Sequence, residues 1–506
     1  MNGEEKQIEA GLADSASRDR GRIWVLAVLV VVFIIALAAR FLPLGPADQW
    51  TLSYRGDLNT QWSPVSVAIG LGLGVVLGFI PMLRRYVGVP ATIATICIVC
   101  FGLNLCLHRP LRGQQWLPRV VLVAFPHANP FFFQATQMVG VRDYVAKDLE
   151  RAQAGYWAAP VHERRLTNFP PGLVVLYGVI VRAAGSWPRM SSAIAEESLF
   201  ELRPPLERAD LQLPIDDSIV AAASMVALFH LFCIAFIPLG VYLVTRRLWD
   251  DEIAIKLAAC SAVIPSVHLF AAMPDAIVPI LGLAAIWTAV ESARNHSKLI
   301  LVANVAILGI GGTISYSIAP IAFMCGSILL LFYPESPWRN RLSLSGWWLG
   351  FGCVAVLVGA LFGVRPIGRF LLAMSNNQAF YERSGRGYFE SLLYNGIEMV
   401  VFGGVIWSML FIAKCVREGR LLRRHGIAAV SDGGRLILIV GVTMGLLFLS
   451  GGARLEVSRN WMLMTPYLVL GAADLVADQS RWQYLLWMMV AVVAAMALVL
   501  ECSFNF

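Results

Sequence analysis

The sequence has few charged residues for its size. Only 14% of its 506 residues are Asp, Glu, Lys or Arg, whereas 58% are hydrophobic. A soluble domain usually carries roughly 25% charged residues, so this chain lacks the polar side chains to cover a water-facing surface. The shortage argues against a soluble globular protein, a disordered chain and a fibrous repeat.

Other patterns are also missing. The chain shows no series of short alternating strands, which a membrane β-barrel requires. Instead it contains many apolar runs near twenty residues, the length of helix that crosses a bilayer core of roughly 30 Å. These features predict an all-α, polytopic integral membrane protein. No internal repeat is visible, although secondary transporters often have one.

Cysteine pairs and basic domains are absent as well. Cys97 and Cys100 have the spacing C-x-x-C, but no second pair follows, so the nine cysteines indicate neither a disulfide framework nor a zinc site. The net charge of +7 comes from short basic clusters between apolar runs, and none is long enough to fold alone as a nucleic-acid-binding domain. His230 and His268 lie inside apolar runs, where we expect core histidines with hydrogen-bonded rings.

The apolar runs predict about thirteen membrane helices. We expect a polar cytoplasmic tail over residues 1–22 and two N-terminal membrane spans within 23–87. A transmembrane module follows over 88–476, and a last span lies within 477–506.

Three hydrophilic stretches interrupt the apolar runs, at residues 108–169, 186–217 and 365–390. Lys and Arg concentrate on the cytoplasmic side of membrane proteins, and the short basic clusters, strongest over 414–424, therefore orient the chain with its N-terminus in the cytoplasm. The three hydrophilic stretches then form outer loops, which agrees with the acidic excess of 186–217. This orientation requires the short run 170–185 to be re-entrant or partly inserted; the alternative is that it spans and two later runs merge.

The first outer loop carries acids and bases close together. Asp143 and Asp148 lie in a predicted helix behind the aromatic-rich stretch NPFFFQATQMVGVRD, and Arg164 and Arg165 precede Phe169-Pro170-Pro171-Gly172. A double proline suits the first turn of a helix. It therefore fixes the point at which the loop enters the next apolar run.

This arrangement resembles the GT-C superfamily of membrane glycosyltransferases, most closely the branch of protein O-mannosyltransferases and aminoarabinose transferases. Their large first outer loop holds an essential acid and ends in H-P-P-G or K-P-P-L. Here Phe169 replaces the usual His or Lys. Asp275 resembles an Asp that opens a later helix in the family, and EVSRNWMLMTPYLVLGAA resembles a Glu-x-x-Arg-x-Trp entry, with Glu456, Arg459 and Trp461.

The resemblance implies transfer of a sugar from a polyprenyl-phosphate donor to a hydroxyl of a lipid, glycan or protein at the outer membrane face. Such a reaction needs a base for the acceptor hydroxyl and cations for the departing phosphate. Asp143 is the first candidate for the base and Asp148 the second. Arg164, Arg165 and Arg459 are candidates for binding the phosphate; Asp275 would orient an arginine or the acceptor, and Glu456 belongs to the same substrate-binding set.

Each candidate also has a structural interpretation. Asp143 and Asp148 could lie on a solvated helix face, and Arg164 and Arg165 could anchor the chain at the lipid headgroups. Asp275 has the position of a helix N-cap. Glu456 and Arg459 have the spacing of an ion pair within one helix. No metal ligand set is predicted, and a divalent metal is left open as a cofactor.

The partners expected are the lipid-linked donor, the acceptor and the bilayer, without nucleic acid, in a bacterial inner membrane. The alternative functions are a secondary transporter or lipid flippase, and a non-catalytic or polymerase-type component of surface polysaccharide assembly.

Overall fold

The computed structural model describes residues 53–54, 64–108, 129–155, 164–196, 202–208, 215–271, 273–333, 336–361, 365–385, 387–451 and 461–478, with 482, 485 and 504–505. Helices dominate these residues, and the only strands described are β1 (Ser53–Tyr54) and β2 (Phe504–Asn505), a two-residue antiparallel pair. The predicted all-α class is thereby confirmed for the described part of the chain.

The α-helices fall into an N-terminal, a central and a C-terminal series. The first series is α2 (Pro64–His108), α3 (Pro130–Thr136), α4 (Val141–Ala154), α5 (Gly172–Ser186), α6 (Pro188–Glu196) and α7 (Arg203–Arg208). The second is α8 (Asp217–Ala235), α9 (Ile237–Thr245), α10 (Asp251–Ser261), α11 (Pro265–Leu269), α12 (Ile277–Asn295), α13 (Lys298–Ile314) and α14 (Ala319–Leu331). The third is α15 (Trp338–Leu361), α16 (Pro366–Arg383), α17 (Tyr388–Gly403), α18 (Val405–His425), α19 (Asp432–Ser450) and α21 (Ala473–Val476).

Short 3₁₀ helices join these elements. They are η2 (Arg164–Asn168), η3 (Pro274–Ala276), η4 (Tyr316–Ile318), η5 (Ile427–Ala429), η6 (Trp461–Leu463) and η7 (Thr465–Ala472).

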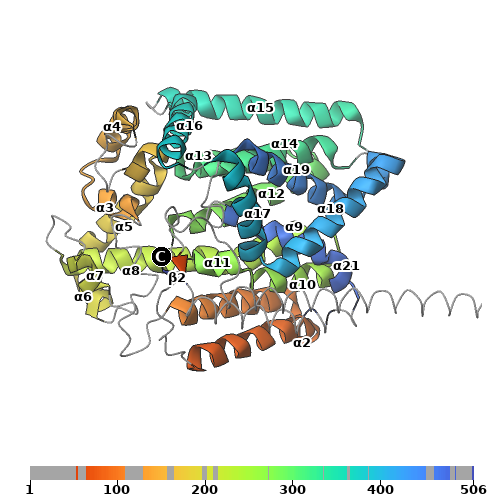
Figure 1. Ribbon diagram of the computed structural model, residues 1–506, viewed down its shortest axis with the longest axis horizontal. Helices are drawn as coiled ribbons and strands as arrows, with labels where there is room; N and C mark the ends of the chain where they lie inside the picture. The colour runs from red at the N-terminus through yellow and green to blue at the C-terminus, as the bar shows by residue number, and fades with distance from the viewer. Residues whose placement is uncertain are drawn as a thin grey trace, which may run out of the picture.

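The centre of the bundle is formed by helices that are apolar on every side. α12 packs against α8, α9, α13 and α14, and most of its residues are buried. α8 is buried in the same way and has almost no polar face. A helix that is hydrophobic all round must lie in a core or a membrane. Figure 1 shows α12 between α15 at the upper edge and α2 at the lower edge.

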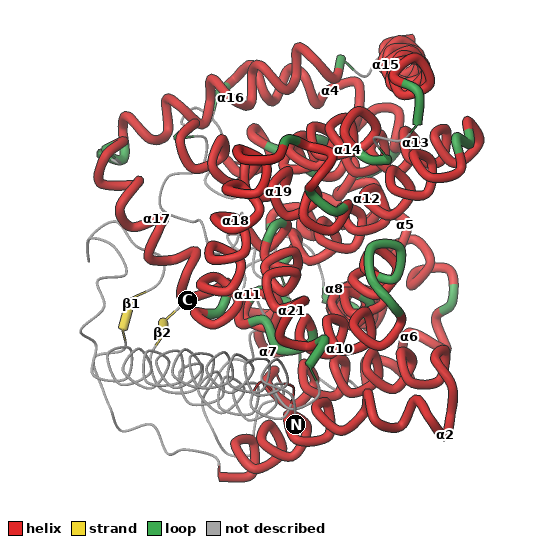
Figure 2. The backbone as a smooth tube through the Cα atoms, turned by 90° about the vertical axis from the view of Figure 1, so that its right-hand side faces the viewer, coloured by secondary structure: helices red, strands yellow, loops and turns green. Residues whose placement is uncertain are grey.

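The helix α15 forms an outer edge of the bundle. Its side chains are apolar and exposed, including Leu349 at 60% and Leu361 at 86%, and Leu344 is its one buried residue. Both ribbon views show α15 at the periphery (Figures 1 and 2). Exposed apolar surface of this extent on a long helix is what a lipid environment stabilises.

Within the described residues, five helical segments are long and apolar enough to cross a membrane, and a sixth is counted if the bent pair α17–α18 is one span. The five are Val75–Leu105, Asp217–Thr245, Pro274–Asn295, Trp338–Leu361 and Asp432–Ser450. Four shorter apolar helices add to them, including Gly172–Ser186. A multi-span membrane architecture is confirmed. The total of thirteen stays a prediction, since residues 23–43 and most of 477–506 lie outside the described residues.

A break divides α2 where the sequence predicts that one apolar run ends and another begins. Gly88 has φ 76° and ψ 169°, in a conformation that only glycine adopts readily. The break lies two residues before Pro90, which lacks the N–H of a regular helix. The two runs thus meet at a fixed bend.

The strongest basic cluster is split between internal pairs and exposed charges. Lys414 Nζ lies 2.7 Å from Asp474 Oδ1 and 3.2 Å from Glu418 Oε1. Arg420, Arg423 and Arg424 are exposed along the end of α18. Only this exposed part is available to interact with a membrane surface.

Cysteine labelling tests the predicted orientation. Ser191 of the second loop is unsuitable because its side chain is buried and donates to the Ala184 carbonyl, so exposed positions replace it. We expect Ala193→Cys and Ser375→Cys to react with a membrane-impermeant maleimide in intact cells and His425→Cys to react only after permeabilisation. Labelling of the unmodified chain is the background control. The reverse pattern would overturn the orientation.

A substitution at Gly471 tests the packing of η7 on α18. A Cβ at this position would collide with the backbone of Leu410 and Phe411, which cannot move aside as a side chain can. We expect Gly471→Ala to lower the free energy of unfolding by about 1–3 kcal/mol, measured by denaturation in detergent. Gly350→Ala is the matched control because its Cβ would have no neighbour within 4 Å. Equal stability of both variants would contradict the packing.

Candidate active site at the polar loops

The aromatic stretch of the first hydrophilic loop, residues 108–169, is buried. Asn129 caps α3 by accepting a hydrogen bond from the Phe132 backbone N–H at 3.3 Å, and Phe131, Phe132 and Phe133 are buried. The ring of Phe131 meets the ring of Phe169 edge-on, with centroids 5.2 Å apart. This ring contact joins α3 to the last residue of the loop. α3 also packs against α5.

The next helix, α4, has two unlike faces. Tyr144, Asp148 and Ala152 are buried at intervals of four residues, whereas Asp143 lies exposed in the first turn. Arg151 stacks on the Tyr144 ring at 3.9 Å and donates to the Tyr144 carbonyl. The two predicted acids thus have different surroundings: Asp143 faces outward and Asp148 faces the protein.

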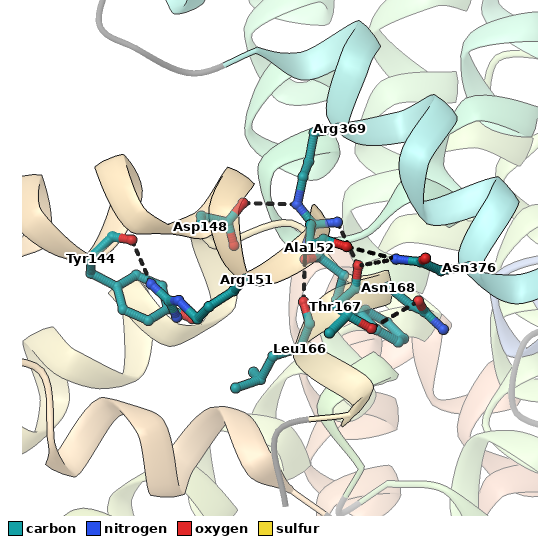
Figure 3. Close-up of polar contacts among 10 residues, drawn as sticks. Tyr144, Asp148, Arg151, Ala152, Leu166, Thr167, Asn168, Arg369 and Asn376 are labelled. Carbon is teal, nitrogen blue, oxygen red and sulfur yellow. Dashed lines mark hydrogen bonds and ion pairs between the residues drawn. The ribbon is translucent and has the colours of Figure 1, made fainter. Parts of the chain in front are cut away.

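Asp148 pairs with an arginine from the third hydrophilic loop, residues 365–390 (Figure 3). Arg369 on α16 is 4% exposed, and its Nε lies 2.9 Å from Asp148 Oδ2. Burial raises the pKa of the Asp148 carboxyl, and the charge of Arg369 opposes this shift. A buried ion pair broken on one side leaves a charge without compensation, which costs several kcal/mol.

The same guanidinium also holds the end of the first loop. Arg369 donates to the carbonyl oxygens of Thr167, Leu166 and Phe169, the last two at 2.8 Å. These carbonyls belong to or follow η2, directly before Pro170. One buried arginine therefore connects α4, η2 and α16.

Two asparagines of α16 reinforce this connection. Asn376 donates to the Ala152 carbonyl at 3.1 Å, and Asn168 of η2 donates to Asn377 Oδ1 at 2.7 Å. Figure 3 shows these groups gathered around the end of η2. The first and third hydrophilic loops, about two hundred positions apart in sequence, fold together into one layer.

The Phe-Pro-Pro-Gly motif lies where this layer meets the apolar helices. Pro170 and Pro171 are buried, and Pro171 is the N-cap of α5, which confirms that the double proline opens the helix. A Cβ at Gly172 would collide with the Thr313 carbonyl on α13. The close contact requires glycine and fixes the entry of α5.

The remaining predicted residues occupy other places. Arg164 and Arg165 begin η2. Asp275 is half-buried in η3, which packs against α8 and α12, and it does not cap α12, whose N-cap is Ala276. Glu456 and Arg459 lie outside the described residues.

A buried pair from two helices lies near Asp275. The Tyr177 hydroxyl on α5 is 2.6 Å from His230 Nε2 on α8, and both side chains are fully buried. Asp275 is close enough to Tyr177 to interact electrostatically with it. His268 likewise lies 2.7 Å from the Ala262 carbonyl and 3.0 Å from Asn104 Oδ1. The prediction that both histidines are hydrogen-bonded core residues is confirmed.

Sequence reasoning missed Arg369 and Tyr177. Arg369, Ala373 and Asn376 follow the buried i, i+4, i+7 spacing of one helix face, which is a detectable signal. Tyr177 lies in an apolar run and gives no such sign. Within the described ranges, no three His, Cys, Asp or Glu side chains group closely enough to hold a metal ion.

The role of Arg369 is tested by removing its side chain. We expect Arg369→Ala to lower the free energy of unfolding by about 3–5 kcal/mol, because Asp148 would be left buried without its partner. Denaturation in detergent measures the loss, and Arg365→Ala, an exposed arginine at the start of the same helix, is the control. Equal stability of the two variants would contradict the connection.

Comparison with solved structures finds several chains that match this structure. The chain is similar to the Archaeoglobus fulgidus oligosaccharyltransferase, solved in complex with Zn and sulfate, at 14% identity and a TM-score of 0.44. The match covers 80% of this chain and 52% of that one, so the chain spans about half the length of that structure. No protein-family model and no curated protein matches the sequence.

Proposed function

We propose that the protein is a membrane glycosyltransferase that moves a sugar from a polyprenyl phosphate to a hydroxyl group at the outer membrane face. The acceptor is a lipid, a glycan or a protein, and the membrane is the inner membrane of a bacterium with the N-terminus in the cytoplasm. The proposal rests on the layer formed by α4, η2 and α16.

The observation that carries the proposal is the position of this layer. It joins an exposed acid on α4 and the start of η2, with its two arginines, to the point where α5 enters the apolar bundle. A lipid-linked sugar has its reactive carbon beside the phosphate, at the boundary between headgroups and water. Polar groups held rigidly at that boundary suit such a substrate.

The reaction needs one base and one cationic site. The acceptor oxygen attacks the anomeric carbon, its proton passes to the Asp143 carboxylate, and the bond from that carbon to the phosphate oxygen breaks. The bonding electron pair leaves with the polyprenyl phosphate. The anomeric centre inverts in one step, and no protein nucleophile is required.

Arginine side chains would stabilise the departing phosphate. A guanidinium binds two phosphate oxygens at once, and Arg164, Arg165 and Arg459 are the candidates. Asp275 and Glu456 would orient the acceptor or one of these arginines.

Asp148 is less suited to the role of base than Asp143. Its carboxylate is 7% exposed and forms an ion pair with Arg369, so an acceptor hydroxyl would have to displace an internal contact. Asp143 has an exposed side chain at the first turn of α4.

The transporter alternative is favoured by one feature. α17 and α18 are bent by 110° at a short break, and broken helices often form transport sites. Uptake of a soluble solute without release of lipid phosphate would support that alternative.

Two isosteric variants test the assignment of the base. Purified protein is mixed with polyprenyl-phosphate mannose, and release of polyprenyl phosphate is followed. We expect Asp143→Asn to lower turnover by about 10²- to 10⁴-fold at unchanged thermal stability, because the side chain is exposed. Asp148→Asn should lower the unfolding temperature instead. Wild-type turnover in Asp143→Asn would exclude this residue as the base.

A further inference from the structure

The exposed face of α18 changes from apolar to basic along the helix. Ile412 and Val416 are 43% and 47% exposed, and Arg420 and Arg423 are exposed further along. These positions are four, four and three residues apart, so they lie on one face of the helix. Arg424 is exposed beside them. The face therefore begins with side chains suited to the interior of a lipid layer and ends with side chains suited to its charged boundary.

The opposite face of α18 is packed against the protein. Phe411, Lys414 and Glu418 are buried there, and the helix contacts both η7 and α19. Because this face is held by the bundle, the helix cannot turn its arginines inward. They stay on the side that faces away from the protein.

The acidic side chains beside this helix are already paired. Glu418 and Asp474 form ion pairs with two other cations of α18, and Asp432 at the start of α19 pairs with Arg435. The three exposed arginines of the last two turns take part in none of the ion pairs or hydrogen bonds among the described residues. Their charges are thus not compensated by the described part of the chain.

The end of α18 is fixed at the level where α19 begins. Arg435 is 4% exposed, donates to the Ile427 carbonyl at 2.9 Å and pairs with Asp432 in the first turn of α19. The helix α19 is long and apolar enough to cross a membrane, so its first residues mark one boundary of the lipid core. The arginines of α18 therefore lie near this boundary.

Other helices reach the same boundary. The Tyr333 N–H, just after α14, donates to Asp432 Oδ1 at 3.4 Å. Tyr333 also interacts electrostatically with Glu291 and Arg294 in the last turns of α12. Figure 1 shows the end of α18 at the right-hand edge of the molecule and α4 at the left-hand edge. This surface is therefore separate from the candidate active site.

We propose that Arg420, Arg423 and Arg424 bind the headgroups of anionic phospholipids in the leaflet at this end of the bundle. A guanidinium binds phosphate oxygens in a bidentate manner, and basic groups beside a membrane helix are attracted to a leaflet of negative charge. A zwitterionic headgroup carries its own cation, which offsets this attraction. The inference concerns a lipid surface and does not depend on the proposed enzyme activity.

The dimensions of the helix fit a lipid better than a soluble polyanion. From Val416 the helix rises roughly 6 Å to Arg420 and roughly 12 Å to Arg424. The headgroup layer on each side of a bilayer is roughly 5–8 Å thick. Side chains that contact acyl chains thus lead directly to arginines at the level of the phosphates. A soluble polyanion would leave Ile412 and Val416 in water.

Lipid binding by the full chain in detergent tests the proposal. Phosphatidylglycerol and phosphatidylcholine with the same acyl chains are titrated separately, and the Kd of each is measured by native mass spectrometry. We expect the wild type to bind phosphatidylglycerol more tightly, and added salt should weaken this preference. Replacing Arg420, Arg423 and Arg424 together by Gln should reduce the preference by about 10- to 100-fold while the Kd of phosphatidylcholine stays unchanged.

Two matched variants serve as controls. Replacing the same three arginines by Lys keeps the charges and should keep most of the preference. Replacing Arg142, Lys147 and Arg189 by Gln removes three exposed charges from α4 and α6 and should leave the preference intact. A wild type that binds both lipids equally would overturn the proposal, and so would an equal loss of preference in the two glutamine variants.

Discussion

The layer formed by α4, η2 and α16 depends on one buried guanidinium. Arg369 compensates the charge of Asp148 and satisfies the carbonyls of Leu166 and Thr167, which would otherwise be buried polar groups at the end of an irregular loop. Each of these groups is costly alone and stable only in the presence of the others. The contacts of Arg369 fix the position of η2 and therefore the direction in which the chain enters α5. The close approach of Gly172 to Thr313 on α13 fixes α5 against the bundle.

Two consecutive helices bury polar side chains in different surroundings. α16 lies against the first loop, and its buried Arg369 and Asn376 donate hydrogen bonds to backbone carbonyls there. α17 enters the bundle with its polar groups inward and its apolar groups toward lipid. A single hydropathy average does not separate these cases, because it measures how apolar a segment is and not which way its few polar residues face. The distinction appears only when burial is known residue by residue.

Much of the fold could be predicted from the sequence. The scarcity of charge predicted the membrane helices, the double proline predicted the start of α5, and the change of apolar run near Gly88 predicted the break in α2. These features depend on local chemistry. The pairing of Asp148 with Arg369 could not be predicted, because it joins segments more than two hundred residues apart. Neither segment contains a sequence pattern that identifies the other as its partner. For the same reason the sequence could rank Asp143 before Asp148 as a candidate base but could not predict that one is exposed and the other buried. Only the packing of α4 gives them different surroundings.

The 3₁₀ winding of η6 and η7 changes how far the chain reaches. Counted as an α-helix, the segment Trp461–Val476 is too short to cross a bilayer. A 3₁₀ helix, however, rises roughly 2.0 Å per residue instead of roughly 1.5 Å. With η6 and η7 making up most of the segment, its reach grows to about 30 Å, the thickness of a hydrocarbon core. The length of this apolar segment is thus set by the pitch of the backbone as well as by the number of its residues.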